Sequence, residues 1–284
     1  MLPPFDLLEP RTLDQALEAI ADGGQPLAGG TNLFPDMRAR GESGGHYVSL
    51  IAINGLRYIN YANGRISVGA RTTISDLMRD PAMTAAAPAL VTAAEVFGGA
   101  MVRNAATIGG NLCYGSPSAD TVPPLLTLDA EVTLVNTSGE RTLPLDEFYL
   151  DYKKTVLKPG ELMTAISWAV PDPNSVNLFY KLGRRRGDAI TVTGVAVMIA
   201  AGDGKCTKAR IALGSVAPTV FRAKSAEAAL EGQALCNRLI DAAARNAADE
   251  CSPIDDIRAS AQYRRHTAHS LVRRLVTKAW KQIA

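Results

Sequence analysis

The chain has 284 residues, of which 47% are hydrophobic and 20% charged, an ordinary composition for a folded protein. Its formal net charge of +2 is close to balance and gives no reason to expect a nucleic-acid partner. No apolar run approaches the roughly 20 residues that span a bilayer, and the start, MLPPFDLLEP, lacks the basic and long apolar regions of a secretory signal. These features predict a cytoplasmic protein with no membrane span.

The four cysteines and three histidines do not form a metal-binding pattern. No CxxC or CxxxC spacing occurs, so we expect no metal ion or iron–sulfur cluster held by this chain. We interpret the cysteines as reduced, mostly buried thiols. His266 and His269 stand three positions apart on a predicted helix, a spacing that suits a metal, but the sequence shows no acidic or thiol partner for them.

The first fifty or so residues predict a small β/α unit. Thr12 is placed to cap a helix, and the pair Gly23-Gly24 to end it. The elements expected in this unit are a helix over 12–23, a strand over 26–28, a turn over 29–32, a short helix over 33–38 and a strand over 47–51.

From residue 57 the pattern changes to that of a hairpin followed by helices. Asn63-Gly64 is a strong turn signal between two short strands. The elements expected in this part are strands over 57–60 and 65–69, helices over 73–79 and 88–97, and strands over 129–135 and 162–170.

The segment PDPNS at 171–175 is the clearest break in the chain, and we predict a domain boundary there. Beyond it we expect strands over 178–182, 191–201 and 206–213, with a tight turn at 202–204, and then helices over 223–230, 239–249 and 261–283.

The last predicted helix has a basic face and an apolar stripe, which is typical of an amphipathic helix with a solvated basic face. A contact with a partner subunit is the alternative interpretation, whereas nucleic-acid binding would require aromatic interleaving and a basic domain. The basic residues are Arg264, Arg265, Arg273, Arg274, Lys278 and Lys281.

Two glycine-rich segments are candidates for binding phosphate. The first, Leu27-Ala28-Gly29-Gly30-Thr31-Asn32, lies at a strand-to-helix turn, where successive N–H groups without side-chain cover favour an anion. It matches neither the GxxxxGK[ST] nor the GxGxxG pattern. Taken alone, it is best interpreted as a structural turn.

The second segment, Thr107-Ile108-Gly109-Gly110-Asn111, is more informative. Its glycines and polar residues stand among many Ala, Ile, Leu and Val residues, unlike those of an ordinary surface loop. A buried loop rich in donors suggests that something other than protein satisfies its backbone groups. The residues themselves leave open both a diphosphate-bearing ligand and a structural loop.

Three segments together carry a resemblance to a known family. In this order and spacing they resemble the FAD-binding medium subunit, or the homologous domain, of the xanthine dehydrogenase and carbon monoxide dehydrogenase group of molybdenum hydroxylases. The likeness covers essentially the whole chain; TIGGN with the downstream SPSAD is specific, and AGGTN alone is not. The segments are LAGGTNLFPDMR, FGGAMVRNAATIGGNLCYGSPSADTVPPLLTLDA and FYKLGRRRGDAITVTGVAV.

The resemblance implies an α+β fold of the wider vanillyl-alcohol-oxidase flavin type. A two-part PCMH-type FAD-binding domain would cover 1–173, with a small β/α unit at 1–54 and a larger α+β unit at 55–173. A C-terminal domain over 174–284 would hold a three-stranded antiparallel sheet with helices.

The resemblance also implies which residues bind FAD. The segments 27–33 and 107–111 match the two loops around the diphosphate, and Phe97 falls next to the isoalloxazine. From the residues alone, Phe97 and Met163 would equally suit a core, and Lys181 would equally suit a solvated hairpin end. The implied set is Leu27, Ala28, Gly29, Gly30, Thr31, Asn32, Leu33, Phe97, Thr107, Ile108, Gly109, Gly110, Asn111, Asp120, Met163 and Lys181.

Three of these residues have individual roles under the resemblance. Asp120 would bond ribityl or adenosine hydroxyls, and Met163 would contact the ring system. Lys181 would stand beside the flavin, where a fixed positive charge stabilises the anionic reduced form.

Two differences between this sequence and relatives of the same fold limit which cofactors we expect and how FAD is attached. The 4-hydroxybenzoyl-CoA reductases carry a cysteine-rich insertion for a [4Fe–4S] cluster just after the second segment, whereas 111–117 here contains one cysteine, so that cluster should be absent. Many members of the wider fold attach FAD through histidine or cysteine. Neither glycine segment contains a histidine, and Cys113 matches no known attachment position, so non-covalent FAD is predicted.

The resemblance implies an electron-relay subunit that does not oxidise the substrate itself. Its partners would be a large molybdenum-cofactor subunit and a small subunit with two [2Fe–2S] clusters, assembled as a dimer of heterotrimers, with a separate terminal electron acceptor. No catalytic nucleophile or triad is recognised in the sequence, in agreement with that role.

Two alternatives stay open. A stand-alone flavin oxidoreductase of the same fold would need its own acid or base, and none is evident. A bridging subunit that has lost flavin would show damage to a glycine segment, and both are intact.

Overall fold

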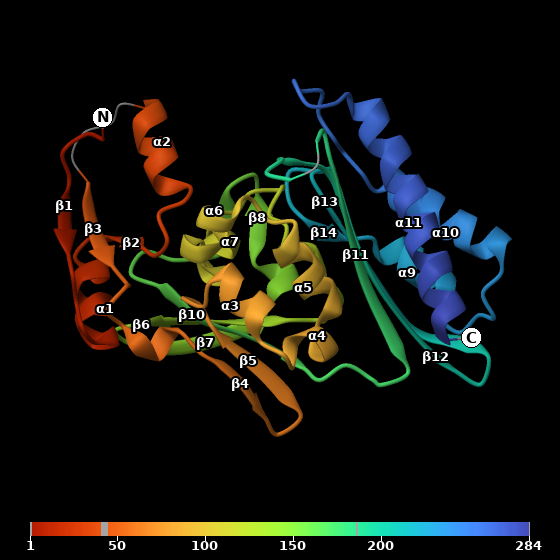
Figure 1. The fold of residues 1–284 in the computed structure, drawn as a ribbon, viewed down its shortest axis with the longest axis horizontal. Helices are drawn as coiled ribbons and strands as arrows, with labels where there is room; N and C mark the ends of the chain where they lie inside the picture. Colours follow the sequence, from red (N-terminus) through yellow and green to blue (C-terminus); the bar gives the residue numbers. More distant parts are fainter. Residues whose placement is uncertain (1, 41–44, 186, 284) are drawn as a thin grey trace.

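The computed structural model describes residues 2–40, 45–185 and 187–283. Three units follow one another along the long axis of the molecule, each with its own sheet and helices (Figure 1). The chain passes through them once, from the N-terminal unit to the C-terminal unit. Within the described ranges, no helix combines the length and apolarity that crossing a membrane requires.

The N-terminal unit is a parallel sheet with two helices, α1 (Leu13–Ala21) and α2 (Leu33–Arg40). Thr12 caps α1 by accepting a hydrogen bond from the Gln15 amide, as predicted. The buried face of α1 packs against β3, and this contact holds the helix on the sheet. The strand order is β1 (Asp6–Leu8), β3 (His46–Ser49) and β2 (Gln25–Leu27).

The middle unit is an antiparallel sheet with short helices packed against it. The predicted hairpin is confirmed: Asn63 and Gly64 both have positive φ, 52° and 71°, as a type I′ turn requires. The strand order is β4 (Ile59–Ala62), β5 (Arg65–Gly69), β10 (Leu162–Ala169), β6 (Glu131–Asn136) and β7 (Gly139–Pro144).

Several short elements of the middle unit were not predicted, because four to six residues are too few for a helical period to be recognised. The predicted helices are present as α3 (Ile74–Arg79) and α5 (Pro88–Glu95). The additional elements are strand β7, α4 (Met83–Ala86), α6 (Ala100–Ala105), α7 (Ile108–Cys113), α8 (Val122–Thr127), the β8 (Tyr149–Asp151) and β9 (Lys154–Thr155) pair, and 3-10 turns at Asn54–Leu56 and Leu145–Glu147.

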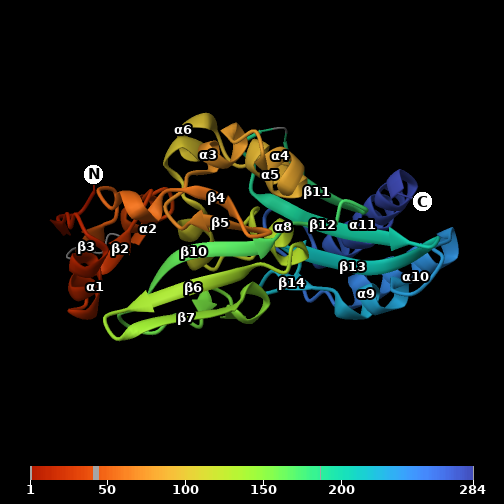
Figure 2. The same cartoon turned by 90° about the horizontal axis from the view of Figure 1, so that it is seen from below.

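The C-terminal unit is an antiparallel sheet in the order β11 (Ser175–Gly183), β12 (Thr191–Gly202), β13 (Lys205–Gly214) and β14 (Phe221–Arg222). The first three are the predicted strands, and the two-residue β14 extends the sheet. The sheet separates two layers (Figures 1 and 2). One side carries α9 (Lys224–Leu230), α10 (Asn237–Asp249) and α11 (Ala261–Ile283), and the other meets α5 and α8 of the middle unit.

The basic face of α11 is not solvated throughout, which corrects the prediction at Arg264. The Arg264 side chain is only 4% exposed. It donates to the carbonyl oxygens of Val192 and Ser215, at 2.7 and 2.8 Å, and to Asp256 Oδ1 at 2.8 Å. Arg264 therefore ties the start of α11 to the start of β12 and to the residue that follows β13.

Asp256 is the counter-charge that keeps this buried guanidinium in place. Burial by itself would raise the pKa of Asp256, but hydrogen bonds from the Arg258 amide and the Arg264 guanidinium outweigh it and lower the pKa to about 2. A depressed pKa in the folded state means that the interaction stabilises the fold above the unfolded-state value and is lost as the pH falls toward about 2.

We predict that Asp256→Asn lowers the free energy of unfolding at neutral pH by about 1–3 kcal/mol, because Arg264 loses its ion pair. The loss should shrink in acid, where the wild-type carboxyl is itself protonated. Urea denaturation at neutral and acidic pH measures both effects. Asp203→Asn, at an exposed turn, is the control; equal stability of Asp256→Asn and wild type at neutral pH would contradict the prediction.

Candidate functional site

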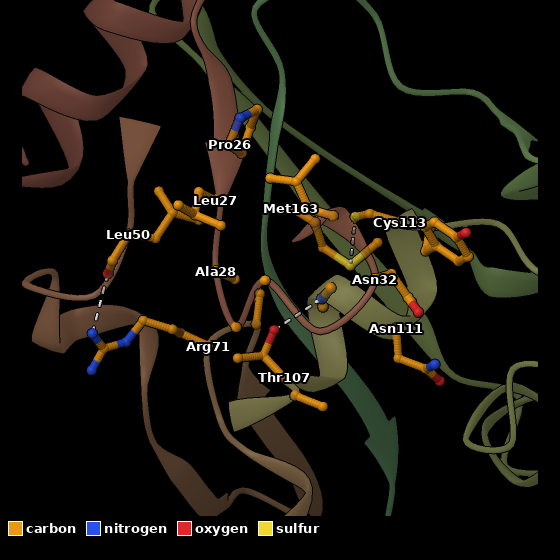
Figure 3. A pocket seen from close by; sticks show the side chains of 18 of the residues that line it. Pro26, Leu27, Ala28, Asn32, Leu50, Arg71, Thr107, Asn111, Cys113 and Met163 are labelled. Carbon is orange, nitrogen blue, oxygen red and sulfur yellow. Dashed lines mark hydrogen bonds between the residues drawn. The ribbon is translucent and has the colours of Figure 1, made fainter. Parts of the chain in front are cut away.

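A cavity of about 350 Å³ lies where the N-terminal unit meets the middle unit (Figure 3). Its walls are mostly apolar side chains and the backbone of the two glycine segments, a lining typical of sites for small molecules and cofactors. The lining residues are Pro26, Leu27, Ala28, Gly29, Gly30, Thr31, Asn32, Leu33, Asp36, Leu50, Leu56, Ala70, Arg71, Phe97, Ala106, Thr107, Gly109, Gly110, Asn111, Cys113, Tyr114, Leu157, Glu161, Leu162 and Met163.

The first glycine segment offers free backbone donors to this cavity. It connects β2 to α2, and Gly30 has a φ of +67°, a conformation that favours glycine. Among the residues that the structure describes, no acceptor receives the amides of 29–32. Buried or half-buried N–H groups without a protein partner favour an anionic ligand such as a phosphate.

Gly29 lies directly against the segment that leads into the second glycine segment. A Cβ built on Gly29 would stand 1.9 Å from the carbonyl oxygen of Ala105, so no side chain fits there. The two glycine segments are therefore in close contact, and they form adjoining walls of the same cavity.

The second glycine segment is the start of a helix, which corrects the sequence interpretation of a loop. Thr107 caps α7, its Oγ1 accepting from the Gly110 amide at 3.1 Å. The amides of Ile108 and Gly109 donate to the carbonyls of Thr72 and Ala70, each at 2.9 Å. Protein groups thus satisfy these donors, so the suggestion that something other than protein satisfies them is wrong for Ile108, Gly109 and Gly110.

The glycines of this segment serve close packing. A Cβ on Gly109 would lie 2.6 Å from Ala70 Cβ, which holds α7 against the end of β5. Ile108 is fully buried in the core of the middle unit, and it is the one predicted residue of the segment that does not line the cavity.

Phe97 and Met163 both line the cavity, as does Cys113 at the end of α7. Met163 is 3% exposed, and its sulfur lies 3.9 Å from Cys113 Sγ. Burial raises the pKa of the Cys113 thiol to about 12, so it stays protonated at neutral pH.

Asp120 and Lys181 do not line the cavity but pair with each other. Lys181 Nζ lies 2.6 Å from Asp120 Oδ2, and both side chains are 8% exposed. Burial raises the pKa of Asp120, and the Lys181 ammonium partly offsets this effect. Lys181 also donates to the carbonyl of Val96 at 3.1 Å, so the pair links β11 to the residue before Phe97.

Sequence reasoning missed three charged residues of the cavity wall: Asp36, Arg71 and Glu161. Arg71 and Glu161 are distant from both glycine segments in the sequence, and only the tertiary structure brings them to the cavity. Asp36 follows the first glycine segment by four positions, so its place in the chain was a signal for it. Tyr114 was missed as well. Its hydroxyl donates to Asp36 of the N-terminal unit at 3.0 Å and accepts from Lys153 of the middle unit at 2.6 Å.

A cavity between two such units, with free amides in one wall, suits a cofactor that carries phosphate. Comparisons with known proteins identify that cofactor as FAD. Residues 3–173 match the family model described as the FAD binding domain in molybdopterin dehydrogenase. Residues 178–279 match the CO dehydrogenase flavoprotein C-terminal domain.

Individual relatives match along their whole length. The carbon monoxide dehydrogenase medium chain of Hydrogenophaga pseudoflava is 32% identical over 288 residues, covering 100% of both chains. A putative xanthine dehydrogenase FAD-binding subunit of Escherichia coli is 29% identical, covering 94% of this chain and 93% of the relative.

Solved structures have the same fold. Carbon monoxide dehydrogenase from Hydrogenophaga pseudoflava superposes with a TM-score of 0.96 at 33% identity, covering 100% of both chains. Quinoline 2-oxidoreductase from Pseudomonas putida 86 superposes with a TM-score of 0.92 at 27% identity, covering 100% of this chain and 99% of the other. This chain belongs to the family of FAD-binding medium subunits of molybdenum hydroxylases; it is an oxidoreductase subunit that binds FAD.

We predict that Gly29→Ala reduces FAD affinity by about 10- to 100-fold, because overpacking at the Ala105 contact costs about 1–3 kcal/mol and displaces the free amides. Titration of the flavin-free protein with FAD, followed by flavin fluorescence, measures the loss. Gly55→Ala is the matched control, since a Cβ there meets no atom within 4 Å. Unchanged affinity in Gly29→Ala would show that the contact does not shape the site.

We also predict that Lys181→Met lowers the free energy of unfolding by about 3–5 kcal/mol, because it leaves the Asp120 carboxylate buried without its counter-charge. Adding Asp120→Asn to Lys181→Met should restore part of the stability, since the remaining side chain is then neutral. Chemical denaturation of the single and double variants measures both effects, with the exposed Lys205→Met as control. Additive losses in the double variant would contradict the coupling.

Proposed function

We propose that this chain is the electron-transfer subunit of a heteromeric molybdenum hydroxylase, receiving electrons from [2Fe–2S] clusters of a partner and passing them to a terminal acceptor. The observation that carries the proposal is the set of free amides at 29–32, which face an otherwise largely apolar cavity. Those donors suit the diphosphate of FAD, the part of the cofactor that carries its negative charge.

The chain's own residues would bind and orient the cofactor. Bound FAD supplies the exchange between one-electron and two-electron transfer. The amides of 29–32 and the wall formed by Thr107, Gly109, Gly110 and Asn111 would hold the diphosphate, and Phe97 and Met163 would contact its ring systems. We retain the whole predicted set as the proposed site, with Ile108 supporting it from the core.

Asp120 and Lys181 would act beside the cavity. Because Lys181 bonds the carbonyl of Val96, the pair holds the backbone that carries Phe97. It also places a buried ammonium group next to the proposed flavin contact. This arrangement supports the proposed role of Lys181 near the cofactor.

FAD would be held without a covalent bond. Cys113 is the one cysteine that lines the cavity among the described residues, and its raised pKa keeps it a thiol and a poor nucleophile. The wall contains no histidine in the part of the chain that the structure describes.

The proposed partners are a large molybdenum-cofactor subunit and a small subunit with two [2Fe–2S] clusters, as a dimer of heterotrimers in the cytoplasm. Support comes from relatives of the same length that are medium chains or FAD-binding subunits of dehydrogenases. We further propose two domains, 1–173 (with subdomains 1–54 and 55–173) and 174–284. Support for that division comes from the two family models, because the first match ends at 173, within the PDPNS segment, and the second begins at 178, just after it.

We predict that the purified chain is yellow, that acid precipitation releases all of its FAD, and that it oxidises no substrate without its partners. With both partners, substrate should bleach the flavin, and omitting the small subunit should abolish the bleaching. A colourless protein would indicate a bridging subunit without flavin and would overturn the electron-transfer role. Flavin retained in the precipitate would indicate a covalent link and would overturn non-covalent binding. Turnover by the chain alone would indicate a stand-alone oxidase and would overturn the need for partners.

A further inference from the structure

Three charged side chains in the described part of the chain line the cavity, and they differ in whether another side chain of opposite charge lies beside them. Asp36 lies 3.8 Å from Lys153 Nζ and accepts the Tyr114 hydroxyl. Glu161 accepts two hydrogen bonds from the Arg141 guanidinium, at 2.7 and 2.8 Å. Arg71, the remaining charged side chain of the wall, forms no ion pair with any acidic residue that the structure describes.

The Arg71 guanidinium is poorly satisfied by protein. Its Nη1 donates to the carbonyl of Leu50 at a long 3.2 Å, and its buried Nε has no partner among the described residues. Burial lowers the pKa of Arg71, and the nearby Arg57 lowers it further. The charge of Asp76 offsets these two effects only in part. The Asp76 carboxylate is engaged by Arg57 through two hydrogen bonds of 2.8 Å.

Arg71 is half-buried, and a cation partly removed from water without a counter-charge costs stability. Groups with pKa values shifted in this way cluster at functional sites. The cavity wall thus contains one positive charge, that of Arg71, for which the described residues supply no ion pair. An anionic ligand in the cavity would provide both the missing charge and the missing hydrogen-bond acceptors.

Backbone hydrogen bonds fix the position of Arg71 relative to the second glycine segment. Its neighbours Ala70 and Thr72 accept the amides of Gly109 and Ile108, and its own amide donates to Leu56 at 2.8 Å. The side chain then reaches across to Leu50, whose amide donates to Leu27 at the end of β2 (Figure 3). Arg71 therefore connects the two units at the cavity wall.

We propose that Arg71 is a further cofactor-binding residue, whose guanidinium pairs with the diphosphate of FAD and complements the free amides of 29–32. The fork of guanidinium N–H groups matches phosphate oxygens bidentately, which an ammonium group does not. This inference rests on the proposed placement of FAD in the cavity.

The test compares full-length wild type with Arg71→Met, Arg71→Lys and the control Arg79→Met, which removes an exposed arginine from α3 of the same unit. Flavin-free protein is titrated with FAD and, separately, with riboflavin, which has no phosphate. We expect Arg71→Met to weaken FAD binding by about 10- to 100-fold, Arg71→Lys to recover only part of it, and riboflavin binding to change less than about twofold.

A second measurement is the unfolding temperature of the flavin-free protein, which Arg71→Met should not lower. Because the unpaired guanidinium costs stability in the empty protein, flavin-free Arg71→Met should unfold at the same or a higher temperature than flavin-free wild type. A large drop in that temperature would instead mean a structural role for Arg71 and would overturn the proposal.

The remaining outcomes separate the two hypotheses. If wild type binds FAD but Arg71→Met binds it equally well, or loses riboflavin to the same extent, the Arg71 inference fails and the proposed function stands. If wild type itself binds no FAD, the proposed function fails first. Higher salt should weaken FAD binding to wild type more than to Arg71→Met, because only wild type has the screened charge pair.

Discussion

The backbone of Gly29 lies against the carbonyl of Ala105, closer than any side chain would permit, and the cavity depends on this contact. It brings the turn after β2 next to the start of α7, although almost eighty positions separate them in the chain. The free amides of 29–32 then face a wall whose own amides are already bonded. One segment offers donors, and the other supplies a rigid support.

Electrostatic compensation around this contact follows one pattern. Buried or half-buried charges are paired within the chain: Glu161 with Arg141, Asp120 with Lys181, Arg264 with Asp256. Removing one partner of such a pair costs much more than the pair itself contributes. Arg71 departs from that pattern, because it lies in the cavity wall and has no ion-pair partner among the described residues.

The C-terminal unit contacts the middle unit beside the cavity. Its sheet packs on α5 and α8, and the core of the middle unit continues onto it through Met198 and Ala212. Lys181 extends this contact to the carbonyl of Val96, beside Phe97. These contacts join the C-terminal sheet to the part of the cavity wall that contains Phe97.

The sequence by itself determined the long elements, because β12 and α11 extend far enough for burial to leave a readable pattern. It also identified both glycine segments and, through the resemblance, the family and FAD. Tertiary structure decided the rest. Thr107 begins a helix because Ala70 and Thr72 accept the amides that follow it, Lys181 meets Asp120 across two units, and Arg71 enters the cavity wall. Each of these three features depends on contacts between positions distant in the sequence. Local periodicity and turn signals contain no information about such contacts.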